Sequence, residues 1–331
     1  MSQPRLDVLA IGNAIVDVIA QADDAFLAEQ GLDKGSMTLI DAGQAQRLYQ
    51  AMAAGREVSG GSAANTAAGV AALGGRAGFI GQVADDQLGE VFSHDIRATG
   101  VEFDTPVIDN GVPTARCLVL VTSDAQRTMG TFLGAAQHLP AGALDPKQIE
   151  DAAILYLEGY LWDPETPRAA MEQAIGIARA AGRKVAFTLS DSFCISRHRE
   201  GFLALIDGGY IDILFANEAE IRELAGEEDL DAAIAAVEGK VPVLVVTRSE
   251  KGAIGLAGGT RAEVAAEPVE KVVDTTGAGD LFAAGFLTGH AQGRGLEESL
   301  RMGAIAAAEV ISHYGARPEA DLKALVASRL G

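Results

Sequence analysis

Short apolar runs alternate with amphipathic stretches along most of this chain. The runs have the length of buried strands, and they cover residues 77–81, 154–158, 184–187, 211–215 and 243–247. Helical segments lie between several of them, for example at 168–181 and 231–239. This repeated βαβ pattern predicts an α/β fold with a doubly wound, mostly parallel sheet and helices on both faces. Ligands of such a sheet bind at the carboxyl ends of its strands.

Composition limits the classes of partner. The chain has 331 residues and a formal net charge of −20, which disfavours binding to nucleic acids or anionic membranes because both require a positive surface. Only Cys117 and Cys194 are present, too few for a disulfide framework or a zinc site. We find neither a signal-peptide core after Met1 nor an apolar run that could span a bilayer, so we expect a cytoplasmic protein.

A glycine turn leads into a helix near the C-terminus. Residues 274–280 read Asp-Thr-Thr-Gly-Ala-Gly-Asp, and an apolar run follows them. The first N–H groups of a helix lack intrahelical partners and can bind a phosphoryl oxygen. Asp280 would then lie beside the phosphate as a base, although an acidic residue in a first turn also simply complements the helix dipole.

A second glycine motif lies far upstream, at Gly60-Gly61-x-x-x-Asn65. Alone this motif is weak evidence of a binding site, because a glycine pair before a helix usually only marks a loop. Together, the two motifs resemble the paired signatures of the ribokinase-like (PfkB) carbohydrate and nucleoside kinases. The resemblance implies a single ribokinase-like domain over 1–331, with a small β-sheet lid formed from about 15–42 and 103–134. The strand-like segments 36–41, 114–121 and 126–132, which lack long intervening helices, agree with such a lid.

The same resemblance implies a phosphoryl transfer mechanism. Asp280 would be the general base, and the amides of Gly277, Ala278 and Gly279 would form an anion hole. The chain has no Walker-type Gly-x4-Gly-Lys sequence and no G-x-G-x-x-G after its first strand, which argues against P-loop and dinucleotide-binding proteins.

The resemblance also implies an ATP site with Mg²⁺. Asn217 and Glu220 match an Asn-x-x-Glu motif that holds water ligands of the metal, although the same spacing is a helix capping box. Thr247 and Gly252 match a nucleotide-contacting segment in which Ser249 replaces the usual first glycine. Further implied positions are Gly315 beside the adenine of ATP, and Asp274 and Thr276 as ligands of a monovalent cation, K⁺.

A third set of positions predicts the binding site of the molecule that accepts the phosphoryl group. Asn13-x-x-x-Asp17 resembles the sugar-binding element of the family, in which the carboxylate accepts from vicinal hydroxyls; Gly60, Gly61 and Asn65 add sugar contacts. Segments resembling those of adenosine kinases suggest an apolar base pocket of Met37, Met129, Leu133, Leu161 and Phe193, although such residues are often plain core. Arg127, in an expected lid strand, would reach the phosphates when the lid closes, unless it is an ordinary surface arginine.

The resemblance therefore implies an ATP-dependent kinase that phosphorylates the 5′-hydroxyl of a nucleoside, adenosine in particular, to give AMP. The alternative within the family is a sugar kinase acting on ribose, fructose or 2-keto-3-deoxygluconate. The alternative from another class is a nucleoside sensor without catalysis, for which Asp280 would serve no purpose. Either way the partners are small molecules and ATP, and the chain acts as a monomer or a homodimer.

Overall fold

Two β-sheets form the framework of the protein, whose computed structural model describes residues 4–124 and 126–331. The larger sheet has eight strands, of which six consecutive ones are parallel and two at one edge are antiparallel. The spatial order is β13 (Thr260–Val264), β12 (Ala253–Ala257), β11 (Val243–Thr247), β10 (Ile213–Asn217), β9 (Lys184–Thr188), β8 (Ala152–Glu158), β1 (Leu6–Ile11) and β5 (Ala77–Ile80). The predicted mostly parallel α/β fold is therefore confirmed.

Helices cover both faces of the large sheet because successive side chains of a buried strand point to opposite faces. In β1, Val8 and Ala10 belong to one apolar cluster, and Leu9 and Ile11 belong to the other. The first cluster includes residues of α3 (Ser62–Ala72), α4 (Gln87–Ala98), α10 (Ala278–Ala291), α11 (Leu296–Val310) and α12 (Leu322–Leu330). The second includes residues of α5 (Pro146–Glu150), α6 (Glu165–Ala180), α7 (Ser192–Asp207), α8 (Glu218–Ala225) and α9 (Leu230–Val237). Within the described ranges, no helix has the length and apolar character needed to cross a membrane.

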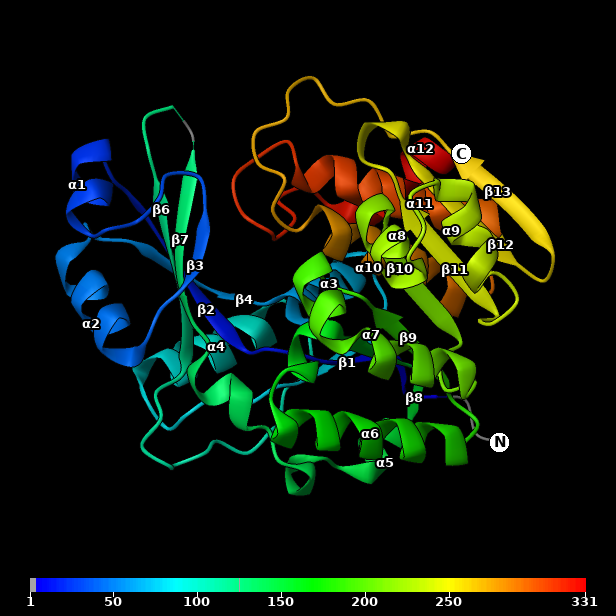
Figure 1. Cartoon of the computed structure of the whole chain (residues 1–331), viewed down its shortest axis with the longest axis horizontal. Coiled ribbons are helices and arrows are strands. Elements are labelled where there is room, and N and C mark those ends of the chain that lie inside the picture. Colours follow the sequence, from blue (N-terminus) through cyan, green and yellow to red (C-terminus); the bar gives the residue numbers. More distant parts are fainter. Residues whose placement is uncertain (1–3, 125) are drawn as a thin grey trace.

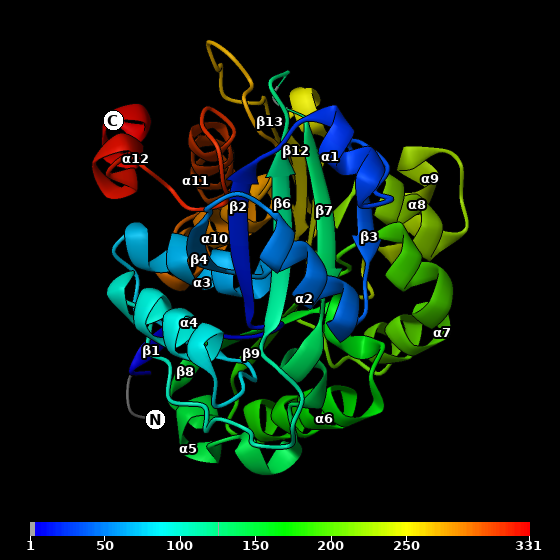
Figure 2. The same cartoon turned by 90° about the vertical axis from the view of Figure 1, so that its left-hand side faces the viewer.

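A five-stranded sheet, called here the small sheet, stands beside this body (Figure 1). Its order is β3 (Met37–Leu39), β7 (Arg127–Phe132), β6 (Ala115–Val121), β2 (Ile15–Gln21) and β4 (Arg56–Gly60). The edge strand β4 lies outside the two segments that we expected to form the lid. Figure 2 shows α1 (Asp24–Glu29) and α2 (Ala42–Ala51) on the side of the small sheet that faces away from the large one.

The alternation of side chains in β2 decides which of them face the large sheet. Val16 and Val18 are buried, whereas Asp17 and Ile19 are partly exposed and line a cavity. A one-residue shift in register would exchange the two sets, so the pairing of β2 with β4 and β6 fixes Asp17 in the cavity wall.

Candidate active site

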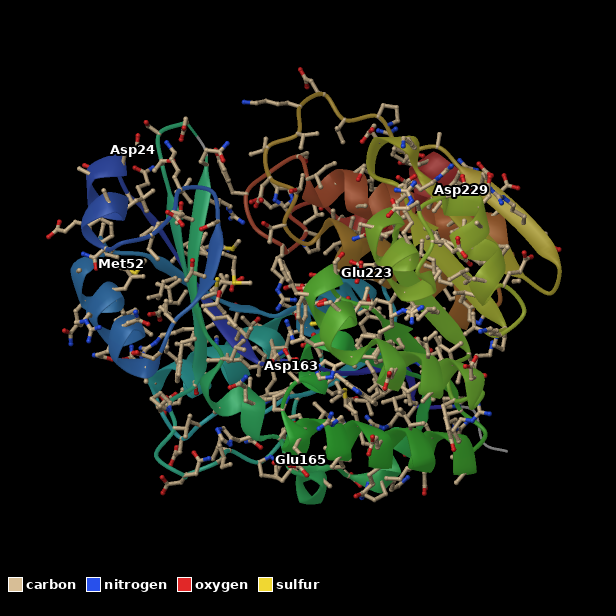
Figure 3. The ribbon with its side chains drawn as sticks, in the orientation of Figure 1. Asp24, Met52, Asp163, Glu165, Glu223 and Asp229 are labelled. Atoms are coloured by element: carbon tan, nitrogen blue, oxygen red, sulfur yellow. The ribbon has the colours of Figure 1, made fainter. Side chains whose placement is uncertain are left out.

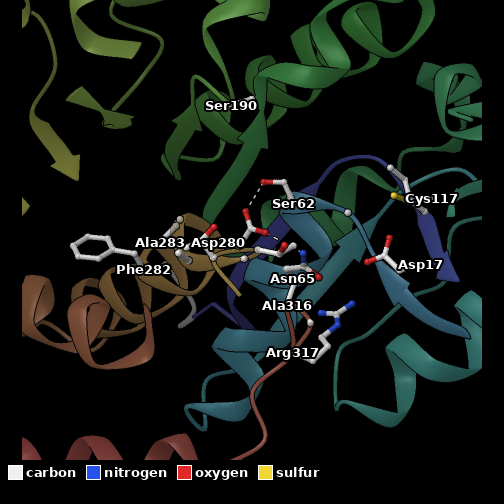
Figure 4. Close-up of a pocket in the computed structure, with 18 of the residues that line it drawn as sticks. Asp17, Ser62, Asn65, Cys117, Ser190, Asp280, Phe282, Ala283, Ala316 and Arg317 are labelled. Atoms are coloured by element: carbon white, nitrogen blue, oxygen red, sulfur yellow. Dashed lines mark hydrogen bonds between the residues drawn. The ribbon is translucent and has the colours of Figure 1, made fainter. Parts of the chain in front are cut away.

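A cavity of about 490 Å³ lies between the small sheet, the N-terminus of α10 and the carboxyl ends of β9, β10 and β11 (Figure 4). Its size suits a small organic ligand. The predicted site residues that line it are Asp17, Gly61, Asn65, Arg127, Met129, Asn217, Glu220, Thr247, Thr276, Gly277, Ala278, Gly279, Asp280 and Gly315. Residues more than two hundred positions apart therefore meet in one cavity.

The N-terminus of α10 is shaped by a required glycine. Gly277 caps the helix with φ at 80°, and a Cβ there would stand 2.7 Å from the Cβ of Ala316. A side chain is thus excluded both by the left-handed backbone and by lack of space. The amide of Ala278 donates to the carbonyl of Thr275 at 3.2 Å, so one of the three amides expected in the anion hole is engaged within the turn.

Asp280 is held by two side chains from α3. Its Oδ1 accepts from the hydroxyl of Ser62 at 2.7 Å, and its Oδ2 accepts from Nδ2 of Asn65 at 2.9 Å. Figure 4 shows the carboxylate between these two groups. Burial raises the pKa of the Asp280 carboxyl, while the bonds from Ser62 and Asn65 act in the opposite direction. A fixed carboxylate with a raised pKa in a cavity is suited to accept a proton.

Close helix packing makes these bonds possible. A Cβ on Gly69 of α3 would stand 2.6 Å from the Cβ of Ala284 on α10, so the glycine lets the two helices approach. The hydroxyl of Thr66 also bonds the carbonyl of Asp280 at 3.2 Å. The first turns of α3 and α10 are therefore fixed against each other.

A buried carboxylate, Glu158, ties the start of α3 to the loop after β1. It accepts from the backbone amide of Asn13 at 2.7 Å, from Nδ2 of Asn13 at 2.6 Å and from the amide of Ala63 at 2.8 Å. Glu158 is fully buried, and burial raises the pKa of its carboxyl to about 7. Asn13 thus faces Glu158 and does not line the cavity. The carboxylate acts on the site through the backbone that it holds.

Gly60 and Gly61 shape the wall next to Asp17. A Cβ on Gly60 would stand 2.5 Å from Oδ2 of Asp17, and one on Gly61 would collide with the carbonyl oxygen of Asn13. Burial raises the pKa of the Asp17 carboxyl to about 6, and the nearby charges of Arg317 and Arg127 oppose that rise. Asp17 is thus a carboxylate that arginines help to keep ionised.

Arg317 was not among the predicted residues, yet it lines the cavity. Its guanidinium donates to the carbonyl of Ser59 at 2.8 and 3.1 Å and to the carbonyl of Ala64 at 2.7 Å. Burial lowers its pKa to about 10, so it stays charged at neutral pH. Together with Arg56 and Arg127, it gives this acidic protein three cations in the cavity wall.

Arg127 connects the small sheet with the glycine turn. From β7, its Nη1 lies 2.7 Å from Oδ2 of Asp274 and donates to Oγ1 of Thr276 at 2.9 Å. The side chains of Arg127 and Asp274 are 10% and 5% exposed, so the ion pair is almost fully buried. The surface-arginine alternative for Arg127 is therefore wrong.

Asn217 and Glu220 form a capping box at the start of α8 and also line the cavity. Oδ1 of Asn217 accepts from the amide of Glu220 at 2.9 Å, and the two Glu220 oxygens accept from the amide and from Nδ2 of Asn217 at 3.0 and 2.6 Å. Burial raises the pKa of the Glu220 carboxyl to about 7. The capping-box alternative is therefore confirmed, and the role of these residues at magnesium-bound water stays a prediction. Among the described residues, no group of three or more His, Cys, Asp or Glu side chains could hold a metal directly.

Several predicted residues lie away from the cavity. Leu161 is fully buried in the core, while Phe193 and Met37 are 74% and 51% exposed. Gly252 has φ at 86°, and a Cβ there would collide with the carbonyl of Val264, so it is a turn glycine. The predicted residues that do not line the cavity are Asn13, Met37, Gly60, Leu133, Leu161, Phe193, Gly252 and Asp274.

The residues that build the site but were missed from the sequence include Ser62, Glu158 and Arg317. Ser62 lies inside the quoted glycine motif, where only Asn65 was chosen. Glu158 is a charge at the end of an otherwise apolar strand, and Arg317 follows directly after Gly315-Ala316. Each of these is a charged or hydroxyl residue at the end of a strand or shortly after a glycine, which is the signal that could have identified it.

Comparison with known proteins relates the chain to kinases. Residues 7–322 match the model of the pfkB family of carbohydrate kinases. The structure of adenosine kinase from Sinorhizobium meliloti is 50% identical, with a TM-score of 0.89 and coverage of 98% of this chain and 99% of that one. A Rhizobium etli structure described as a probable sugar kinase is 45% identical, with a TM-score of 0.91 and coverage of 99% of both chains. The 5-dehydro-2-deoxygluconokinase of Shouchella clausii is 28% identical, and the match covers 97% of this chain and 96% of that protein.

Proposed function

Because the chain belongs to the pfkB family of carbohydrate kinases, we propose that it transfers the γ-phosphoryl group of ATP to the 5′-hydroxyl of adenosine, giving AMP and ADP. One observation carries the proposal. Asp280, at the N-terminus of α10, shares a cavity with Asp17 on the small sheet, so a carboxylate next to phosphate-binding amides faces a carboxylate suited to a sugar diol.

In the proposed reaction, Asp280 accepts the proton of the acceptor hydroxyl as that oxygen attacks the γ-phosphorus. The bond from phosphorus to the oxygen bridging to the β-phosphate breaks, and ADP leaves. Ser62 and Asn65 orient the carboxylate, which keeps the proton acceptor in place before the substrate arrives. The amides at the start of α10 stabilise the negative charge on the transferring group.

The ATP phosphates would lie between α10 and the start of α8. Mg²⁺ would neutralise part of their charge, and Glu220, which lines the cavity at the start of α8, would hold it. Since both oxygens of Glu220 already accept from Asn217, the carboxylate fits a role of binding metal-bound water better than direct coordination. Thr247 and Gly315 contribute further parts of the wall on this side of the cavity.

Two observations favour adenosine over a free sugar. The chain is 50% identical to the Sinorhizobium meliloti adenosine kinase over almost its whole length. The inner face of the small sheet also presents Ile15, Ile19, Val119 and Met129 to the cavity, and apolar side chains suit a purine base better than the hydroxyls of a sugar. Met129 is the one member of the predicted base pocket that lines this cavity.

A sugar kinase is the second candidate, and the cations of the cavity wall favour it. Arg56, Arg127 and Arg317 could bind a sugar acid, and the Rhizobium etli and Shouchella clausii proteins carry sugar-kinase descriptions. A nucleoside sensor is disfavoured, because binding alone needs no carboxylate held beside phosphate-binding amides.

A substrate panel tests the proposal. ADP release would be measured with ATP and Mg²⁺ in the presence of adenosine, inosine, ribose, fructose, 2-keto-3-deoxygluconate or 5-dehydro-2-deoxygluconate. We expect the highest kcat/KM with adenosine. A higher value with a free sugar would assign the chain to the sugar kinases, and tight adenosine binding without ADP release would favour the sensor.

A further inference from the structure

The carboxylate of Asp274 is surrounded by donors from its own chain. Its Oδ1 accepts from the amide and the hydroxyl of Thr276 at 3.1 and 2.8 Å, and its Oδ2 accepts from the amide of Gly315 at 2.9 Å. Nη1 of Arg127 approaches the same Oδ2 at 2.7 Å. A carboxylate offers about four lone-pair sites, and four donors face this one.

The hydroxyl of Thr276 bonds the same carboxylate and the same guanidinium. It donates to Oδ1 of Asp274 and accepts from Nη1 of Arg127 at 2.9 Å. A monovalent cation binds oxygen atoms whose lone pairs replace its water shell. All four lone-pair sites of the Asp274 carboxylate face donors, and the hydroxyl of Thr276 keeps only one of its two lone pairs. Since the guanidinium of Arg127 also stands 2.7 Å from Oδ2 of Asp274 and would repel a second cation, these side chains do not fit a potassium ion in this structure.

A positive charge is nevertheless present at the expected place. The guanidinium of Arg127 supplies the unit charge that K⁺ would bring, next to the glycine turn that opens α10. We infer that Arg127 replaces the monovalent cation: its guanidinium, carried on the small sheet, is the built-in counter-ion of the Asp274 loop, and catalysis needs no K⁺. The inference deepens the proposed function and rests on it for its activity readout.

The replacement has a structural consequence. A bound ion would leave the glycine turn independent of the small sheet, whereas Arg127 comes from β7 and ties the two together. The charge that supports the phosphate-binding turn is then present only when the small sheet is in place. A buried ion pair loses its compensation when one partner is removed, so the carboxylate of Asp274 should attract another cation in an Arg127→Ala variant.

Thallium(I) binding and potassium dependence test this inference. Crystals of the wild type, of Arg127→Ala and of the surface control Arg261→Ala would be soaked in thallium(I) acetate, and anomalous density would be sought at Asp274. Arg261 pairs with Asp231 and Glu263 and does not line the cavity. We expect density only in Arg127→Ala. We further expect ADP release by the wild type to be the same in K⁺ and tetramethylammonium salts, and that of Arg127→Ala to rise about tenfold with K⁺.

Thallium at Asp274 in the wild type, or saturable activation of the wild type by K⁺, would overturn the inference. Absence of thallium from Arg127→Ala would also overturn it, because the loop itself and not the guanidinium would then exclude the ion. The crystallographic readout needs no acceptor, so a wrong acceptor assignment would leave this test intact.

Discussion

Nδ2 of Asn65 donates to Oδ2 of Asp280 across 2.9 Å, joining two residues that are 215 positions apart. The two glycine motifs of the sequence therefore form one unit. The first supplies Ser62 and Asn65, and the second supplies the carboxylate that they hold. This pairing explains why each motif alone is ambiguous, since the carboxylate of Asp280 is positioned only when both helices are packed together.

Removing the hydroxyl of Ser62 should shift the pH dependence of turnover. Its hydrogen bond lowers the pKa of the Asp280 carboxyl, so in Ser62→Ala that pKa rises. Because the base must be ionised, the acidic limb of the kcat profile moves to higher pH, and kcat recovers in alkaline buffer. Ser196→Ala, which removes an exposed hydroxyl on α7, is the control. Equal acidic limbs in wild type and Ser62→Ala would contradict the assignment.

Asp17→Asn should weaken acceptor binding more than it slows the chemical step. A hydrogen bond to a charged group contributes about 1.5 to 3 kcal/mol, so we expect the acceptor KM to rise about 10- to 100-fold with a smaller change in kcat. Steady-state kinetics with adenosine at saturating ATP measures both constants. A large fall in kcat with unchanged KM would place Asp17 at the reacting atoms instead of at the sugar.

Glu158→Gln should flatten the pH dependence of stability. The folded protein raises the pKa of this carboxyl from 4.5 to about 7, so folded Glu158 keeps its proton to higher pH than unfolded Glu158. Its contribution is full below about pH 4.5 and is lost as the pH rises through 7, which lowers the free energy of unfolding. Urea unfolding between pH 4.5 and 8 should show a smaller fall for Glu158→Gln than for the wild type. The exposed control Glu90→Gln should lose as much free energy of unfolding over this pH range as the wild type. An equally large loss in Glu158→Gln would show that this carboxyl is not the source of the pH dependence.

Arg317→Met should destabilise the fold and weaken substrate binding together. The guanidinium satisfies the carbonyls of Ser59 and Ala64, which join the end of β4 to the start of α3. Loss of these charge-assisted bonds should cost about 2 to 4 kcal/mol in the free energy of unfolding. Urea unfolding measures this cost, with Arg261→Met as the surface control. A loss of stability no larger than that of the control would show that the hydrogen bonds of Arg317 have no structural role.

Local sequence patterns were enough to predict the large sheet, because its strands are apolar runs separated by helical segments. The small sheet was harder to predict from the sequence. Its edge strand Arg56–Gly60 contains Arg56 and Glu57 and has no apolar run, since an edge strand faces solvent on one side. Strand pairing in space, rather than local composition, defines such an element.

The same distinction separates the parts of the site. The place of Asp280 and the glycine turn in the cavity could be predicted because a glycine turn that opens onto a helix is a local sequence pattern, and the proposed phosphate site rests on that pattern. Leu161 and Phe193 were chosen for their apolar character, which does not determine direction: one points into the core and the other into solvent. Arg317 and Glu158 act by bonding backbone groups that come from other segments, and no local pattern encodes those partners.

The most direct test of the account follows the phosphate into the product. Wild type and Asp280→Asn would be incubated with adenosine and ATP labelled at the γ-phosphate, and the labelled product would be identified by chromatography and mass spectrometry. We expect labelled AMP from the wild type and about 10³-fold less from the variant, with ATP binding retained. Equal labelling of AMP by both proteins would contradict the role of Asp280, and no labelled AMP from the wild type would contradict the proposed reaction.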